Sequence, residues 1–426
     1  MPDAPQSHQL AELDSGLRVV TERMPSVRSV ALGLWVRTGS RDELVEQAGI
    51  SHFLEHLLFK GTERFSSEEI DQIFDGMGAE VNAGTSKETT SVYARCLDRH
   101  LERSLEVIAD MMLAPAYRDV DSERQVVIEE IAMYEDEPSD KVHDVLAGAV
   151  FGDHPLGRPI IGSADVVGSV PVPDIAAYHS SRYVGPNLVL AAAGNLEHAQ
   201  VVAQAERLLG GRSGEPANGS EPVTFDGPAV RFHTKDTEQY HLALGGPGFA
   251  RGDDRRFALR VLDTLLGGSS SSRLFQEVRE KRGLAYAVYS YASSFADIGQ
   301  VGVYVGTRRD NVGEALGIVG DQLRRLQDQP VPADELDRAK ENVKGRTVLS
   351  MESTLARMNR LGSSVLMDVP ILSLDELLAE IDAVTAEDVA ELARTAYGPA
   401  SMSAAGVGPD ESVFRDALAG AELAAA

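Results

Sequence analysis

The 426-residue chain has a single cysteine, Cys96, and few basic residues, with 40 Lys and Arg against 66 Asp and Glu. One cysteine excludes an intrachain disulfide framework and a cysteine-rich zinc module. The formal net charge of −26 argues against a general nucleic-acid-binding protein, which needs basic surface to meet phosphate. The charge is compatible with cationic partners such as basic peptides, although solubility alone would also account for it.

Long hydrophobic runs are also missing. The most apolar stretch, Leu188 to Gly194, is far too short to span a bilayer. The N-terminal segment 1–6 has neither an apolar core nor a positively charged region before it, so we expect no signal peptide. The acidic residues Asp3, Glu12 and Asp14 fit poorly with an arginine-rich transit peptide. These features predict a cytoplasmic protein without a membrane segment.

The overall composition, with 43% hydrophobic and 25% charged residues, is typical of a globular protein. A chain of this length exceeds one ordinary core, so we expect at least two domains. Residues 211–228 are rich in glycine, proline, serine and asparagine and lie near the middle of the chain. We therefore expect an N-terminal domain over 1–210, a linker over 211–228 and a C-terminal domain over 229–426.

The two halves repeat one order of elements: an apolar helix, a strand region, a long amphipathic helix and a charged helix. The expected ranges are 50–60, 79–95, 101–113 and 122–134 in the first half, and 256–266, 284–305, 312–326 and a helix opened by Glu335 in the second. Residues 300–305 alternate as a half-buried strand does. Helices are grouped between strands, which favours an α+β fold of two homologous domains, each a mainly antiparallel sheet covered by helices on one face.

The segment His52-Phe53-Leu54-Glu55-His56 lies in the apolar helix of the first half. His52 and His56 are four residues apart, so their rings share one helix face and can coordinate a single metal ion. Glu55 is close enough to reach a metal-bound water without ligating the ion. The helix is apolar almost all round, which predicts burial. Since buried histidines and carboxylates need polar partners, zinc explains them more completely than a hydrogen-bonded pair of core histidines would.

A third ligand is expected from the charged helix over residues 122–134. Its core-facing stripe holds two acids among apolar residues: Glu123, Val126, Val127, Glu130 and Ile131. Glu129 points away from this stripe. We predict that Glu130 ligates zinc and that Glu123 orients a histidine from outside the ligand set, the alternative being that Glu123 pairs with a neighbouring arginine.

Two histidines and one carboxylate leave a fourth position for water, the arrangement of a catalytic zinc. Zinc lowers the pKa of that water, and Glu55 would take its proton as it attacks a peptide carbonyl. The sequence therefore predicts a peptide-bond hydrolase.

His-x-x-Glu-His is the inverted zinc-peptidase motif. Continued through Phe59-Lys60-Gly61-Thr62, the segment resembles the pitrilysin and mitochondrial processing peptidase superfamily, most closely its bacterial single-chain members. Residues 123–131, whose Glu130 follows the motif after 73 residues, and Gly283-Leu284-Ala285-Tyr286 extend the resemblance over nearly the whole chain. It implies that Glu130 is a zinc ligand, in agreement with its place on the stripe.

The resemblance implies further residues. Arg279 and Tyr286 match residues that help polarise the scissile carbonyl and its oxyanion. Read from the sequence alone, they could equally be a surface helix residue and a strand core residue. Asn82 and Ala83 lie on the strand that in relatives pairs with the substrate backbone.

The second half lacks the metal-binding motif. Asp337 and Lys344 stand where the first half has Glu123 and Glu130, so we expect one zinc per chain. Larger relatives enclose substrate with four such domains, which implies a homodimer for a chain with two. The expected function is a zinc-dependent endopeptidase for short or unfolded peptides. A protease dedicated to one precursor, and a non-catalytic scaffold subunit of the same fold, remain as alternatives.

Overall fold

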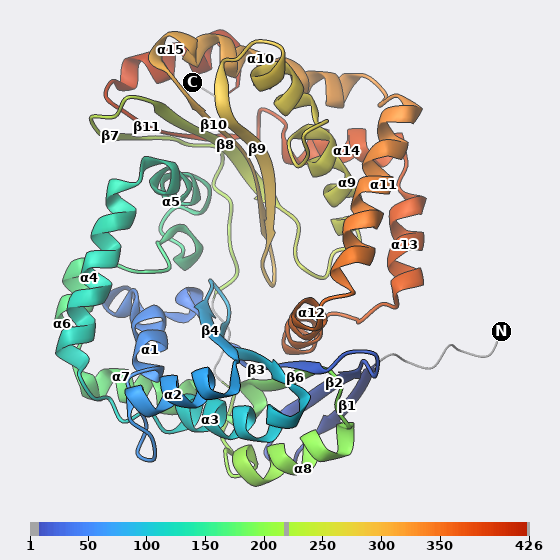
Figure 1. The fold of residues 1–426 in the computed structure, drawn as a ribbon. Helices are drawn as coiled ribbons and strands as arrows, with labels where there is room; N and C mark the ends of the chain where they lie inside the picture. Colours follow the sequence, from blue (N-terminus) through green and yellow to red (C-terminus); the bar gives the residue numbers. More distant parts are fainter. Residues whose placement is uncertain (1–7, 217–220, 424–426) are drawn as a thin grey trace. The chain divides into compact units, whose positions relative to one another are not determined.

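The computed structural model describes residues 8–216 and 221–423. The predictions for the N-terminal segment 1–6, for part of the linker (217–220) and for the last three residues lie outside the described residues. The chain forms two compact units (Figure 1). Unit 1 comprises Met1–Ile131, Pro159–Ser220 and Val348–Ser373, and unit 2 comprises Ala132–Arg158, Glu221–Thr347 and Leu374–Ala426. Each half of the sequence thus contributes one segment to the other unit.

Unit 1 is built on a six-stranded sheet in the order β1-β2-β6-β3-β5-β4. Its strands are β1 (His8–Glu12), β2 (Arg18–Arg23), β3 (Ser29–Val36), β4 (Glu80–Thr85), β5 (Thr90–Leu97) and β6 (Leu188–Gly194). Neighbouring strands are antiparallel except β2 and β6, which run parallel. The apolar side chains of β3 and β6 fit this central position, where both faces of the sheet are covered.

The helices of unit 1 are α1 (Ile50–Leu58), α2 (Ser67–Met77), α3 (Leu101–Leu113), the first part of α4 (Val120–Asp136), α6 (Ala164–Ser169), α7 (Val172–Arg182), α8 (His198–Leu209) and α12 (Thr354–Leu366). Figure 1 shows α3 and α8 on one side of the sheet and α12 on the other. Along β3, Leu32 and Leu34 enter the core under α3, whereas Ala31 and Trp35 pack against α12. The period of two along a strand sends alternate side chains into these two cores.

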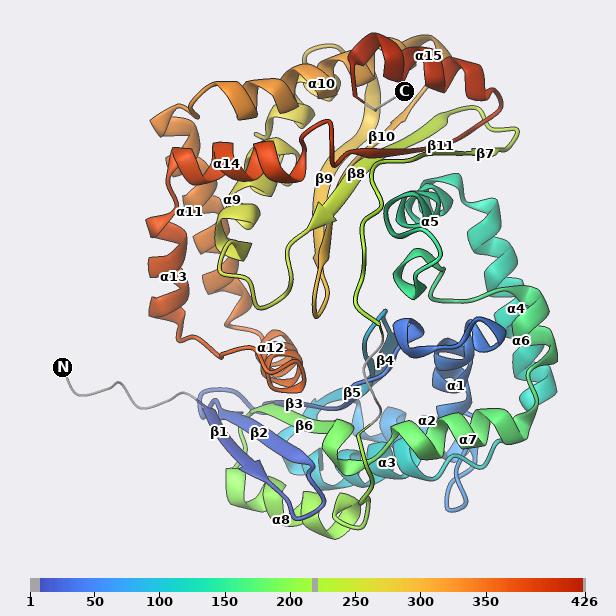
Figure 2. The same cartoon turned by 180° about the vertical axis from the view of Figure 1, so that it is seen from behind.

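Unit 2 is built on a five-stranded sheet in the order β7-β11-β8-β10-β9. Its strands are β7 (Val230–Thr234), β8 (Tyr240–Gly248), β9 (Ala285–Ser294), β10 (Gly299–Thr307) and β11 (Ser403–Gly408), of which β7 and β11 are parallel. Its helices are α5 (Pro138–Phe151), α9 (Arg256–Leu266), α10 (Val312–Asp328), most of α11 (Ala333–Ser350), α13 (Leu374–Ala383), α14 (Ala386–Ala396) and α15 (Glu411–Ala421). Figure 2 shows α5 and α15 on opposite sides of β11.

The predicted α+β class, with two sheets covered by helices, is confirmed by this architecture. Each sheet also receives one helix on its second face, α12 in unit 1 and α5 in unit 2. The prediction of a half-buried strand at 300–305 is therefore wrong. All nine residues of β10 are buried, because α5 covers the face that the alternation assigned to solvent.

No helix within residues 8–216 and 221–423 is both long enough and apolar enough to cross a lipid bilayer.

Candidate metal centre and catalytic site

Helix α1 carries the His-x-x-Glu-His segment and begins with a buried carboxylate cap. The Glu43 carboxylate accepts the backbone N–H of Gly49 at Oε2 and the backbone N–H of Ser51 at Oε1, each at 2.8 Å. A negative group at this end complements the helix dipole. Gly49 has φ 98°, a conformation that glycine adopts without strain. Glu43 is not predicted from the sequence, because it precedes the helix by seven residues and no local capping pattern marks it.

The side chains of His52, His56 and Glu130 converge within unit 1. Oε2 of Glu130 lies 3.6 Å from Nε2 of His52 and 3.3 Å from Nε2 of His56. Ligand atoms about 2.0–2.2 Å from a tetrahedral zinc are separated from one another by about 3.3–3.6 Å. One ligand atom from each residue lies within 4.8 Å of the other two. Two imidazoles and one carboxylate at these separations fit a zinc ion.

Burial keeps His52 in the form that a metal requires. Its residue exposure is 8%, and burial, helped by the neighbouring His56, lowers the pKa of the His52 imidazole to about 4. The ring is therefore neutral at neutral pH, with a lone pair to give to a metal. The two rings meet edge to face, with centroids 4.7 Å apart.

Glu55 lies on the same helix turn but outside the group of ligand atoms. Burial raises the pKa of its carboxyl above the ordinary value. Its Oε2 atom is buried and has no hydrogen-bond partner among the residues that the structure describes. A carboxyl group with a raised pKa, next to a candidate metal site, is suited to accept and return a proton.

Glu123 reaches the back of His56 from helix α4. It is only 5% exposed, and its Oε1 lies 2.8 Å from Nδ1 of His56. Its Oε2 lies 2.6 Å from Nζ of Lys60. Lys60 is a further site residue that the sequence did not predict, although a signal was present: on the helix expected over 50–60, Lys60 lies four residues after His56, on the same face.

Helix α4 presents Glu123 and Glu130 as expected, with one difference. Glu123, Val127 and Ile131 are buried and Glu129 is exposed, but Val126, expected on the core-facing stripe, is 51% exposed. The buried face is therefore narrower than the predicted stripe, and it leaves Val126 on the solvent side.

Asn82 and Ala83 lie on β4, the edge strand next to α1. One side of β4 pairs with β5, and its other side has no partner strand among the described residues. The Asn82 side chain is exposed, and its Oδ1 accepts the N–H of Ala83 at 2.8 Å. Helix α1 packs against this strand, so the free edge runs beside the metal-binding motif.

Arg279 and Tyr286 meet within unit 2. Arg279 lies on a π-helical turn, Phe275–Glu280, a local structure that is frequent at functional sites. Its guanidinium stacks 4.3 Å from the centroid of the Tyr286 ring and donates to the Tyr286 carbonyl at 3.1 Å. Tyr286 is 79% exposed, so its position is not that of a strand core residue.

The positions of unit 2 that correspond to the metal site hold other contacts. Lys344 pairs with Glu341 at 2.5 Å and Asp382 at 2.7 Å. On α9, Asp263 accepts the Ser290 hydroxyl at 2.6 Å, and burial raises the pKa of the Asp263 carboxyl to about 6. These residues act in local packing.

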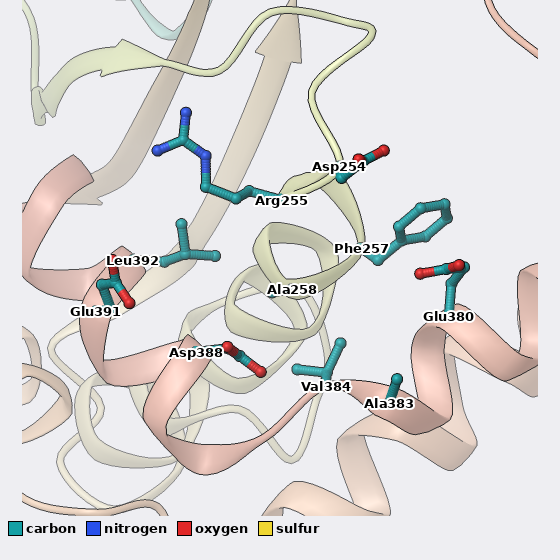
Figure 3. Close-up of a pocket in the computed structure, with 10 residues that line it drawn as sticks. All are labelled: Asp254, Arg255, Phe257, Ala258, Glu380, Ala383, Val384, Asp388, Glu391 and Leu392. Atoms are coloured by element: carbon teal, nitrogen blue, oxygen red, sulfur yellow. The ribbon is translucent and has the colours of Figure 1, made fainter.

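A separate surface pocket of about 400 Å³ lies in unit 2 between α9, α13 and α14 (Figure 3). It contains none of the predicted site residues. The carboxylate of Asp388 on its wall bonds the N–H and hydroxyl of Thr385 at the start of α14. Arg255 pairs with Asp253 through two hydrogen bonds of 3.0 and 2.6 Å. These polar groups stabilise the surrounding helices.

Two histidines one helix turn apart, a carboxylate from a second helix and a nearby glutamate define a metallopeptidase type of site. Comparison with known proteins identifies the family. Residues 18–164 match the description "Insulinase (Peptidase family M16)", and residues 169–343 match "Peptidase M16 inactive domain". The chain belongs to peptidase family M16, which confirms the resemblance found in its sequence.

The chain is similar to proteins named zinc proteases. One from Streptomyces coelicolor, named an uncharacterized zinc protease, is 45% identical over 96% of this chain and 92% of its own length. The protein YmxG of Bacillus subtilis, named in the same way, is 42% identical over 90% of this chain and 94% of its own length. These relatives support a zinc-dependent peptidase.

Solved structures share the fold at lower identity. A protease from Helicobacter pylori superposes with a TM-score of 0.88 at 23% identity, covering 94% of this chain and 99% of its own. A chain of complex III from Candida albicans gives a TM-score of 0.84 at 21% identity, covering 98% of this chain and all of its own. At these identities the likeness concerns the fold alone.

Proposed function

We propose that this protein is a zinc-dependent endopeptidase that hydrolyses short or unfolded peptides. The observation that carries the proposal is the convergence of His52, His56 and Glu130 within 4.8 Å, with Glu55 on the same helix turn. Zinc bound there would polarise the scissile carbonyl and favour ionisation of the attacking water.

In this proposal Glu55 is the general base. Its raised pKa suits a group that takes a proton from the attacking water and returns it to the leaving amine. His52, His56 and Glu130 hold the metal, and Glu123 keeps His56 in place from outside the ligand set. Glu55 is left free for chemistry because it does not ligate.

Substrate binding is proposed for two further pairs of residues. The free edge of β4 at Asn82 and Ala83 offers backbone groups to an extended peptide, which would add as a further strand. An extended chain is available in short or unfolded peptides and not in folded proteins. Arg279 and Tyr286 would donate to the oxyanion that develops on the scissile carbonyl. The net charge of −26 favours basic peptides among the substrates.

We propose one zinc per chain and a homodimer. Within the described ranges, no second group of three possible ligands accompanies the one formed by His52, His56 and Glu130. Light scattering at working concentration tests the assembly, for which the proposal predicts twice the mass of 45.7 kDa. A purely monomeric protein would contradict the dimer and leave the peptidase proposal intact.

A peptide library tests the activity. The purified chain should cleave many unstructured peptides, lose cleavage when a chelator removes the metal, and regain it when zinc is restored. A folded protein containing a cleaved sequence is the control and should resist. Cleavage at a single sequence in the whole library would favour the dedicated processing protease. No metal-dependent cleavage of any peptide would favour the non-catalytic scaffold.

A further inference from the structure

Lys60, Glu123 and His56 form a chain of contacts behind the metal site. Nζ of Lys60 lies 2.6 Å from Oε2 of Glu123, and Oε1 of the same carboxylate lies 2.8 Å from Nδ1 of His56. We propose that Lys60 is a positioning residue: it fixes Glu123, which in turn fixes the ring of His56 for metal binding. The inference rests on the proposed zinc site and extends it to a residue that does not touch the metal.

The Glu123 carboxylate is held by contacts at both of its oxygens. Glu123 is 5% exposed, so both of its oxygens need partners from the protein. Each has one, Lys60 for Oε2 and His56 for Oε1. If the Lys60 contact is removed, the carboxylate can turn about its last bond to find another donor, and the contact with His56 loosens with it.

The Glu123 carboxylate in turn holds the imidazole ring of His56. A carboxylate accepts hydrogen bonds, so the contact with Glu123 places the N–H of His56 on Nδ1. Nε2 is then the atom with the free lone pair, and it is this atom that faces Glu130 at 3.3 Å. Fixing Nδ1 from behind therefore fixes both the tautomer and the direction of the metal-binding nitrogen.

Lys60 is itself well placed for this task. It follows the last turn of α1, where its backbone N–H donates to the carbonyl of Leu57 at 3.1 Å. Gly61 then turns the chain away with φ 98°. The neighbouring Arg124 is directed elsewhere and donates to the carbonyls of Val167 and Val170. In the part of the chain that the structure describes, Lys60 is the lysine or arginine that forms an ion pair with Glu123.

The other histidine provides an internal contrast. Nδ1 of His52 is buried and has no hydrogen-bond partner within the described residues. Only one of the two histidines is therefore held from behind by a carboxylate. The Lys60–Glu123 pair accordingly acts on the His56 side of the metal site.

Whether Lys60→Met weakens or tightens zinc binding distinguishes a positioning role of Lys60 from a purely electrostatic one. Lys60 carries a positive charge, and a positive charge repels a divalent cation. If Lys60 acted only through its charge, Lys60→Met would tighten zinc binding. If Lys60 positions Glu123 and His56, the same substitution weakens zinc binding, because the ligand is no longer preorganised.

The test is a zinc dissociation constant measured on the full chain by competition with a chelator of known affinity. Loss of an outer contact of a ligating histidine typically weakens binding about 10- to 100-fold. We expect about 10-fold or more for Lys60→Met and for Glu123→Gln. The double variant should bind no more weakly than Glu123→Gln alone, since both substitutions remove one chain of contacts. Lys60→Arg, which keeps the ion pair, should restore most of the affinity.

Arg64→Met is the matched control, because Arg64 follows Lys60 in the same loop and pairs with Glu106 and Asp110. It should bind zinc as the unsubstituted chain does. Thermal melts of the metal-free proteins check folding, and Lys60→Gln replaces Lys60→Met if the latter does not fold. Unchanged or tighter zinc binding by the folded Lys60 variant would overturn the role of Lys60. Absence of zinc binding by the unsubstituted chain would instead overturn the proposed function.

Discussion

Nε2 of His56 and Oε2 of Glu130 lie 3.3 Å apart, although helices α2 and α3 and strands β4 and β5 lie between them in the sequence. The contact joins the short helix α1 to the long helix α4. Because each helix sets the position of its side chain by packing, the ligand geometry depends on the core of unit 1 as well as on the motif.

The first prediction concerns the ligands. His52→Ala and Glu130→Ala should each remove a direct ligand and leave the purified protein with little or no zinc. Glu129→Ala is the control, since Glu129 is the exposed neighbour of Glu130 on the same helix. Elemental analysis after dialysis measures the content. Full zinc occupancy in both ligand variants would contradict the assignment.

The second prediction concerns the exposed pair of unit 2. Tyr286→Phe and Arg279→Ala should lower kcat/KM by about 100- to 1,000-fold, the usual loss for an oxyanion donor. Zinc content should not change. Because Tyr286 is 79% exposed, its substitution should leave the melting temperature unchanged. Arg282→Ala is the control and should remain active, since Arg282 lies two residues after this turn and pairs with Glu277. Near-normal kcat/KM in Tyr286→Phe would contradict a catalytic role for Tyr286.

The third prediction concerns the helix that unit 1 receives from the second half of the chain. A Cβ atom added at Gly362 of α12 would lie 2.7–2.9 Å from ring atoms of the buried Trp35. Gly362→Ala should therefore destabilise the fold by about 1–3 kcal/mol. At Gly345, an exposed position of α11, an added Cβ meets nothing within 4 Å. Gly345→Ala should be neutral or stabilise by up to about 1 kcal/mol. Denaturant midpoints measure both, and equal effects would contradict the packing of α12 on Trp35.

The fourth prediction concerns Asp263 and pH. Burial raises the pKa of its carboxyl from 3.8 to about 6 in the folded protein. The protonated group therefore contributes stability that is complete below pH 3.8 and is lost as the pH rises through about 6. Asp263→Asn keeps an oxygen for the Ser290 hydroxyl and removes the titration. Its stability relative to the unsubstituted chain should rise between pH 4 and 7.

The control for this prediction is Asp337→Asn, at an exposed position of α11. Its stability difference from the unsubstituted chain should change little over the same pH range. Denaturant titrations at several pH values provide the comparison. A pH-independent difference for Asp263→Asn would show that Asp263 is ionised in the folded protein throughout.

Much of the metal centre can be predicted from local spacing. His52 and His56 share a face because helix geometry brings residues four apart together. Glu123 and Glu130 are two turns apart on one helix, which places both on the same face. Neither of these two relationships needs knowledge of the tertiary fold. The contact of Lys60 with Glu123 does, since it depends on how α1 and α4 approach each other.

The exchange of segments between the units could not be predicted from periodicity. Residues 354–366 form an amphipathic helix, but this pattern does not state which sheet it will cover. A signal for the second covered face was present in Leu188–Gly194, which has no polar side chain at any position. Such continuous apolar runs are typical of strands buried on both faces.

Glu55→Gln provides the most direct test of the account. Zinc content and peptide turnover should be measured on the same samples of this variant and of the unsubstituted chain. Because Glu55 is proposed as base and not as ligand, the variant should keep one zinc per chain and lose about 100- to 10,000-fold in kcat. Near-normal peptide hydrolysis by the zinc-loaded variant would contradict the account.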